Sequence, residues 1–131
     1  MRIEPSGLKS LHCFEPLSDS ELQQLCDSTI VQGYRKGDYL IREGGLNHFL
    51  FFIARGSVHI KSYGVTIAKL TSGDLIGEVS IAGLGAPIAD VTASGPVLTY
   101  KFPIKTIHKI TSTNRLFASH LHSQAMGRVF Q

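Results

Sequence analysis

The hydrophobic positions of this chain follow a helical period near both ends and a strand-like period in between. Near the N-terminus, Ser-Asp-Ser-Glu at residues 18–21 fits a capping box, with Ser18 as the N-cap and Glu21 at the third helical position. The apolar positions at helical spacing in this region are Leu8, Leu11, Phe14, Leu22, Leu25 and Cys26. This pattern predicts a short helical turn that ends near Pro16 and an amphipathic helix from about residue 18 to 28.

Between residues 30 and 103, glycines at short intervals divide the chain into pieces of strand length. These pieces are rich in aromatic and β-branched residues, which favour strands. Short strands with a turn signal about every ten residues are typical of an antiparallel sandwich or barrel. The predicted strands are Tyr39–Ile41, Phe49–Ala54, Ser57–Tyr63, Val65–Leu70, Ala89–Ser94 and Val97–Phe102.

After Pro103 the helical period returns and predicts two more helices. The apolar positions of the first, short helix are Ile104, Ile107 and Ile110. The second helix is predicted from about residue 114 to 130, after a polar segment that includes Asn114 and suits a helix cap. Its apolar stripe consists of Phe117, Leu121, Ala125 and Val129. Two outcomes stay open for this stripe: it joins two copies as a homodimer, or it packs back on the strands.

The composition is that of one packed domain. Of the 131 residues, 43% are hydrophobic and 18% are charged, so a single core spanning residues 1–131 is expected and disorder is not. The longest apolar run, Phe49–Ala54, is too short to cross a membrane, and the N-terminus lacks the apolar segment of a secretory signal. The two cysteines form no C-x-x-C pair. We therefore expect a cytoplasmic protein in a reducing environment, without membrane association.

The net charge of +3 is unevenly distributed along the chain. All ten acidic residues lie at or before Asp90, whereas residues 91–131 carry five basic residues and no acidic one. A basic C-terminal region can meet nucleic acid or an acidic partner. Because a nucleic-acid site clusters its lysines and arginines on one face, and these five are dispersed, the sequence favours a solvated helix face instead.

The sequence contains no recognisable catalytic or metal-binding arrangement. The six histidines show no H-E-x-x-H pattern and no metal-ligand spacing with carboxylates. Ser80 is preceded two positions earlier by Glu78 and not by glycine, so it forms no nucleophile elbow. The Gly83-Leu84-Gly85 segment lacks the third glycine of a dinucleotide-binding loop. We therefore expect neither enzymatic activity nor a bound metal.

Three glycine-containing segments together resemble the cyclic nucleotide-binding domain family. They are Tyr-Arg-Lys-Gly-Asp-Tyr-Leu-Ile-Arg-Glu-Gly at residues 34–44, Arg-Gly-Ser-Val at residues 55–58 and Ser-Gly-Asp-Leu-Ile-Gly-Glu-Val-Ser-Ile at residues 72–81. The resemblance implies a mainly β fold, an eight-stranded jelly-roll-like β-barrel at residues 30–103, with N-terminal helices at residues 1–29 and C-terminal helices at residues 104–131. Transcription regulators of this family begin a helix-turn-helix about where this chain ends. We therefore expect no direct DNA binding without an added domain.

The resemblance also implies a ligand-binding cassette at residues 77–93. In the family, the Gly-Glu pair that stands here as Gly77 and Glu78 opens a short helix, whose backbone N–H groups face the cyclic phosphate while the glutamate holds the ribose. A helix N-terminus favours an anion, and a carboxylate accepts hydrogen bonds from hydroxyl groups. The candidate ligand-binding residues are Gly77, Glu78, Val79, Ser80, Ala86, Pro87, Ile88 and Asp90.

The cassette departs from the family pattern at its phosphate-binding position. The family places an arginine there, but this chain has Pro87 or Ile88, depending on the register, and no lysine or arginine lies between Lys69 and Lys101. Asp90 stands where the family has threonine or serine and adds a negative charge. We therefore expect a non-catalytic sensor or regulatory domain that binds cyclic AMP or cyclic GMP at most weakly. The alternative is a ligand-free interaction or dimerisation module of the same fold.

Overall fold

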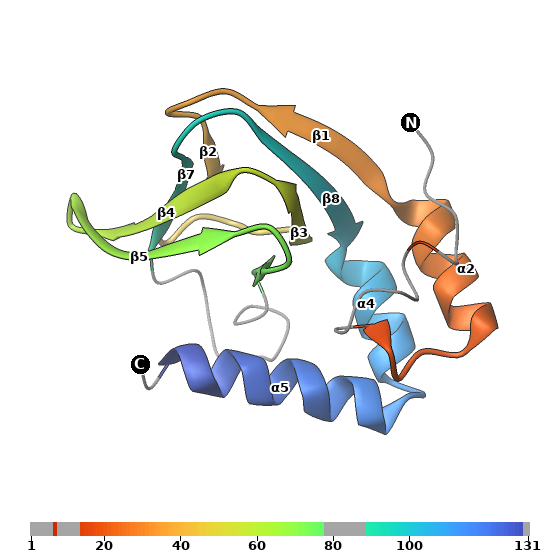
Figure 1. Cartoon of the computed structure of the whole chain (residues 1–131). Coiled ribbons are helices and arrows are strands. Elements are labelled where there is room, and N and C mark those ends of the chain that lie inside the picture. The colour runs from red at the N-terminus through yellow and green to blue at the C-terminus, as the bar shows by residue number, and fades with distance from the viewer. Residues whose placement is uncertain (1–6, 8–13, 78–88, 130–131) are drawn as a thin grey trace.

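A computed structural model of the chain shows two four-stranded antiparallel sheets packed face to face, with helices at both ends of the sequence (Figure 1). It describes residue 7, residues 14–77 and residues 89–129, with side chains as far as residue 122. The strands are β1 Ile30–Tyr34, β2 Tyr39–Ile41, β3 Phe49–Arg55, β4 Ser57–Ser62, β5 Val65–Thr71, β6 Leu75–Ile76, β7 Asp90–Ala93 and β8 Val97–Pro103. The first sheet has the order β1-β8-β3-β6, and the second has the order β2-β7-β4-β5.

The predicted fold class, a mainly β jelly roll with flanking helices, is confirmed in the described part of the chain. The six strands predicted from the hydrophobic pattern are present with ends shifted by at most one residue. The pattern did not predict β1 and β6. β1 contains Gly33 and shows no alternation of buried and exposed positions, and β6 has two residues that are defined by pairing with Phe51 and Phe52 of β3.

The described helices are α2 Asp19–Ser28, α4 Ile104–Thr111 and α5 Arg115–Val129. The predicted capping box of α2 is confirmed, because the backbone N–H of Glu21 donates to Ser18 Oγ at 3.2 Å and the backbone N–H of Ser18 donates to Glu21 Oε1 at 2.8 Å. Of the shorter helical turn predicted before it, Leu8 and Leu11 lie outside the described residues. No helix in the described ranges is long and apolar enough to span a membrane.

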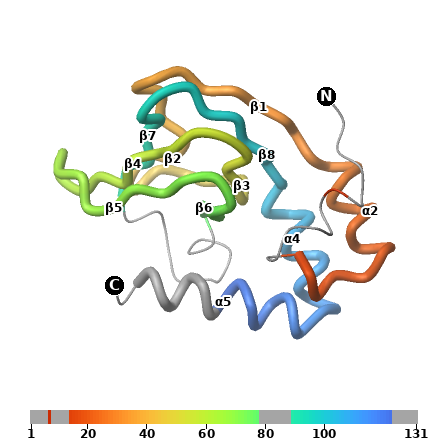
Figure 2. Tube along the Cα trace, viewed as in Figure 1, coloured from red at the N-terminus to blue at the C-terminus, as the bar shows by residue number. Residues whose placement is uncertain are grey.

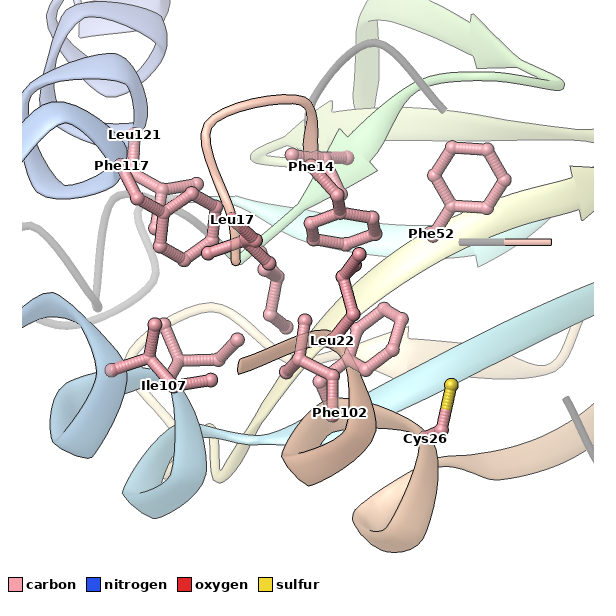
Figure 3. Close-up of a cluster of buried hydrophobic side chains, with 13 residues drawn as sticks. Phe14, Leu17, Leu22, Cys26, Phe52, Phe102, Ile107, Phe117 and Leu121 are labelled. Atoms are coloured by element: carbon pink, nitrogen blue, oxygen red, sulfur yellow. The ribbon is translucent and has the colours of Figure 1, made fainter. Parts of the chain in front are cut away.

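Two apolar clusters lie on opposite faces of the first sheet. In β3, Leu50 and Phe52 point toward the helices, and Phe51 and Ile53 point toward the second sheet. The helix-side cluster joins α2, α4 and α5 to the sheet, and Figure 3 shows its aromatic rings meeting near Phe14. Its buried members are Phe14, Leu17, Leu22, Leu25, Cys26, Leu50, Phe52, Leu75, Phe102, Ile107, Ile110, Phe117 and Leu121. The helices therefore cover one face of the first sheet, and the opposite face of this sheet lines the space between the two sheets.

Asn114 connects the start of α5 to the start of α2. Its side-chain oxygen accepts from the backbone N–H of Phe117 at 3.0 Å, which caps α5. Its side-chain N–H groups donate to the Pro16 carbonyl at 3.0 Å and to Glu21 Oε1 at 2.9 Å. Partial burial raises the pKa of the Glu21 carboxyl, but hydrogen bonds from the Ser18 backbone, Asn114 and the Ser18 side chain outweigh it, so this pKa lies below its ordinary value.

Asn114→Ala is expected to lower the free energy of unfolding by about 1–2 kcal/mol at neutral pH, because α5 loses its cap. The effect of this substitution should shrink on acidification. A carboxyl whose pKa is lowered in the folded state contributes stability above its unfolded value, and this contribution is lost as the pH falls through the folded value. Urea unfolding of both proteins between pH 3 and 7 measures the difference.

Asn114→Asp is a second variant for this prediction: it keeps an oxygen for the Phe117 N–H, loses both donated bonds and puts a second carboxylate beside that of Glu21. At neutral pH the repulsion between the two carboxylates should destabilise the fold, and this effect should fade on acidification. A difference between wild type and Asn114→Ala that stays constant with pH would contradict the contribution of Glu21.

Candidate ligand-binding site

Gly77, Asp90 and Lys101 lie at the same end of the two sheets, which we call the cassette end. β7 and β8 belong to opposite sheets and are joined by the short segment 94–96. The start of β7 and the end of β8 therefore both lie at the end of the sheets opposite to this connection. Asp90 is the first residue of β7, and Lys101 lies near the end of β8. Phe51 pairs with Lys101 on one side and with Ile76 on the other, which places Gly77 beside the same row of residues.

Gly77 forms a backbone turn that other residues adopt only with strain. Its φ is +99°, and a Cβ atom at this position would lie 2.8 Å from both the Phe49 carbonyl oxygen and Asn47 Nδ2. Asn47 fixes this neighbourhood, because its Nδ2 donates to the Phe49 carbonyl at 2.8 Å and its Oδ1 accepts from the Phe49 N–H at 3.2 Å. The glycine is therefore required where the chain leaves β6. Sequence reasoning did not identify Asn47, since its role depends on a contact with Gly77.

Asp90 makes a structural contact at the cassette end. Its Oδ1 accepts from the backbone N–H of Glu43 at 2.8 Å and so ties the segment after β2 to β7. The neighbouring Val91 points into the cluster between the sheets, so strand alternation puts Asp90 on the outer face of the second sheet. Lys61, its register partner on β4, lies on the same outer face. This contact between positions 47 residues apart was not predictable from the local sequence.

The space between the sheets presents an apolar wall. Its buried residues are Ile41, Phe51, Ile53, Val58, Ile76, Val91, Ala93 and Val97. Leu40, Phe49, Ile60 and Leu70 pack against them and remain partly exposed. Among the described residues, no group of histidine, cysteine, aspartate and glutamate side chains is arranged to hold a metal ion.

Lys101 is the cation on the inner side of the first sheet. Its Nζ donates to Gln32 Oε1 at 2.7 Å and lies 4.1 Å from the ring centre of Phe49 and 5.8 Å from that of Phe51. Burial lowers the pKa of this ammonium group below its ordinary value. Sequence reasoning assigned Lys101 no role, although its spacing from Val97, two strand periods earlier, was a signal that it shares the inner face.

Most of the predicted cassette lies outside the described residues. These positions are Glu78, Val79, Ser80, Ala86, Pro87 and Ile88. Their roles stay predictions. Of the ligand-binding residues predicted from the sequence, the structure describes Gly77 and Asp90 and brings both to the cassette end.

The first two residues of the apolar stripe predicted on the last helix pack inside the chain's own core. Phe117 and Leu121 are buried in the helix-side cluster, on the face of α5 that packs against the rest of the molecule (Figure 3). The side chains of Ala125 and Val129 lie outside the described residues. The homodimer through this helix stays a prediction. Leu116, which is 70% exposed on the same helix, is a described apolar residue available for such a contact.

Comparison with known proteins identifies the class to which this fold and site belong. The profile of the cyclic nucleotide-binding domain family matches residues 31–114, which is more than half of the chain, so the chain belongs to this family. A cAMP-dependent protein kinase regulatory subunit from Debaryomyces hansenii is 33% identical over 75 residues, which cover 56% of this chain and 17% of that protein. Human potassium/sodium hyperpolarization-activated cyclic nucleotide-gated channel 4 is 25% identical over 96 residues, 73% of this chain and 8% of the channel. The chain thus spans less than a fifth of these relatives.

Solved structures share the fold over almost the whole chain. The regulatory domain of Toxoplasma gondii PKA with cAMP has a TM-score of 0.81 and 22% identity, covering 94% of this chain and 48% of that one. The regulatory subunit of a cAMP-independent protein kinase A from Trypanosoma brucei has a TM-score of 0.77 and 24% identity, covering 95% and 43%. A form of that subunit with three substitutions, one of them threonine to arginine, was solved with cAMP in its A site.

Proposed function

We propose that this chain is a non-catalytic sensor or regulatory domain that binds a nucleotide at the cassette end, with weak affinity for cyclic AMP and cyclic GMP. The observation that carries the proposal is the Gly77 turn. Its left-handed backbone and its close approach to Phe49 admit only glycine, at the position where the family begins its ligand-binding cassette. The partly exposed apolar residues that pack against the wall, such as Phe49 and Leu40, offer a surface for a base.

Weak affinity for cyclic nucleotides follows from the residues at the phosphate position. Pro87 or Ile88 replaces the arginine that makes a bidentate, charge-assisted contact to phosphate in the family. Losing a hydrogen bond to a charged group removes about 1.5–3 kcal/mol of binding free energy, which is roughly a tenfold to hundredfold loss of affinity. The relatives support this reasoning, because the Trypanosoma brucei subunit is described as cAMP-independent and its cAMP-bound form carries an introduced arginine.

The double substitution Pro87→Arg with Asp90→Thr is expected to strengthen cyclic AMP binding by about tenfold to a hundredfold. The arginine should contribute most of this gain, since Asp90 is bonded to the Glu43 N–H on the outer face of the sheet. Asp90→Thr alone is the matched control and should change affinity by less than about tenfold. Titration calorimetry of wild type, the control and the double variant measures the three dissociation constants.

Two results would change the proposal. Tight binding of cyclic AMP by the wild type would contradict the proposed weak affinity. Absence of nucleotide and nucleoside binding by both the wild type and the double variant would favour the alternative, a ligand-free interaction or dimerisation module of the same fold.

A further inference from the structure

We propose that Lys101 supplies a positive charge that faces an anionic ligand at the cassette end and compensates only in part for the arginine that the cassette lacks. This inference rests on the proposed function and assigns the anion-recognising residue of the same site. It makes the negative charge of the ligand, and not only its base, a determinant of binding.

The position of Lys101 on the inner face follows from the pairing of the first sheet. Lys101 pairs with Phe51, and Phe51 pairs with Ile76, so the three residues form one row on the same face of β8, β3 and β6. Phe51 and Ile76 are buried in the cluster between the sheets, which shows that this row faces the second sheet. Lys101 is therefore an inward-facing cation at the rim of the apolar wall.

The distance from Lys101 to the Gly77 turn is within the reach of one small ligand. Neighbouring strands lie about 4.8 Å apart, so the backbones of Lys101 and Ile76, two strands apart, are separated by about 10 Å. The ammonium group lies over the ring of Phe49, and the carbonyl oxygen of the same residue approaches Gly77. Phe49 therefore links the two positions, with the ammonium over its ring and the Gly77 turn at its backbone.

The surroundings of Lys101 leave its charge available. Its described polar partner is the neutral amide oxygen of Gln32, and its other close neighbours are the two phenylalanine rings. Charges interact more strongly where protein replaces water, so a partly desolvated ammonium without a carboxylate partner among its described contacts gains from a nearby anion.

The other charged groups described at this end do not occupy the same position. Asp90 and Lys61 lie on the outer face of the second sheet, and the Asp90 carboxylate is bonded to the backbone N–H of Glu43. Lys69, the last cation before the cassette, is exposed on β5. Its neighbour Leu70 packs against the inner cluster, so Lys69 lies on the opposite, outer face. Lys101 is thus the inward-facing cation among the described residues of these strands.

Calorimetry with cyclic AMP and with adenosine tests the assignment, because the two probes share a base and differ in charge. Lys101→Met should weaken cyclic AMP binding at least tenfold and leave adenosine binding within twofold of wild type. Lys101→Arg should retain most of the preference for cyclic AMP. Lys69→Met is the matched control, which removes a lysine from the outer face and should leave the affinities for both probes unchanged.

The outcomes separate this inference from the proposed function. If wild type binds both probes and Lys101→Met weakens them equally or not at all, the role of Lys101 is wrong and the proposed function stands. If wild type binds neither probe at millimolar concentration, both are wrong. Lys101→Gln, which keeps a polar group on the sheet, provides the same measurement if the methionine variant unfolds at a lower urea concentration than wild type.

Discussion

Gly56→Ala should lower the free energy of unfolding by about 2–5 kcal/mol, because the new methyl group meets backbone atoms that have no room to move. Gly56 has a φ of +88°, and a Cβ atom there would lie 2.3 Å from the Pro96 carbonyl oxygen and 3.1 Å from Val97 Cα. The left-handed backbone costs a non-glycine residue about 1–2 kcal/mol, and overpacking adds about 1–3 kcal/mol. The turn between β3 and β4 is therefore forced away from the start of β8.

Gly73→Ala separates the two contributions to this effect. Gly73 has a similar φ of +97°, but apart from its two chain neighbours no atom of the described residues lies within 4 Å of its Cβ position. This control should cost only the backbone contribution of about 1–2 kcal/mol. Urea unfolding of the three proteins gives the comparison, and equal destabilisation by both substitutions would contradict the steric argument for Gly56.

Phe117→Ala is expected to lower the free energy of unfolding by about 3–5 kcal/mol, the usual cost of removing a large buried ring. Phe117 is fully buried, its ring centre lies 6.1 Å from that of Phe14, and Phe14 in turn meets the edge of Phe102 at 5.2 Å. The substitution therefore leaves a cavity where α5 joins the first sheet and the segment before α2. Figure 2 shows that α5 begins next to α4 and runs away from it.

Leu116→Ala is the matched control on the same helix, because Leu116 is 70% exposed. It should change stability by no more than about 0.5 kcal/mol, as expected for a surface position. Thermal or urea unfolding of both variants measures the difference. Similar effects of the two substitutions would mean that α5 is not anchored through Phe117.

The jelly-roll topology brings together residues that are distant in the sequence, and this explains which predictions were accurate. The capping box at Ser18 and Glu21 was predictable because all of its atoms come from four consecutive residues. The glycine turns were predictable for the same reason. By contrast, Asn114 contacts Glu21 across 93 positions, and Asp90 contacts Glu43 across 47, so neither contact leaves a local pattern.

The sequence by itself determined the class of fold, most strand boundaries and the family, because period, turn chemistry and motif spacing are local properties. Only the tertiary structure decided which face each residue occupies. It turned Phe117 and Leu121 toward the chain's own core, Asp90 toward the outer face and Lys101 toward the inner one. The physical reason is strand pairing: whether a cation meets a ligand or the solvent depends on the register between strands, and the local sequence does not specify that register.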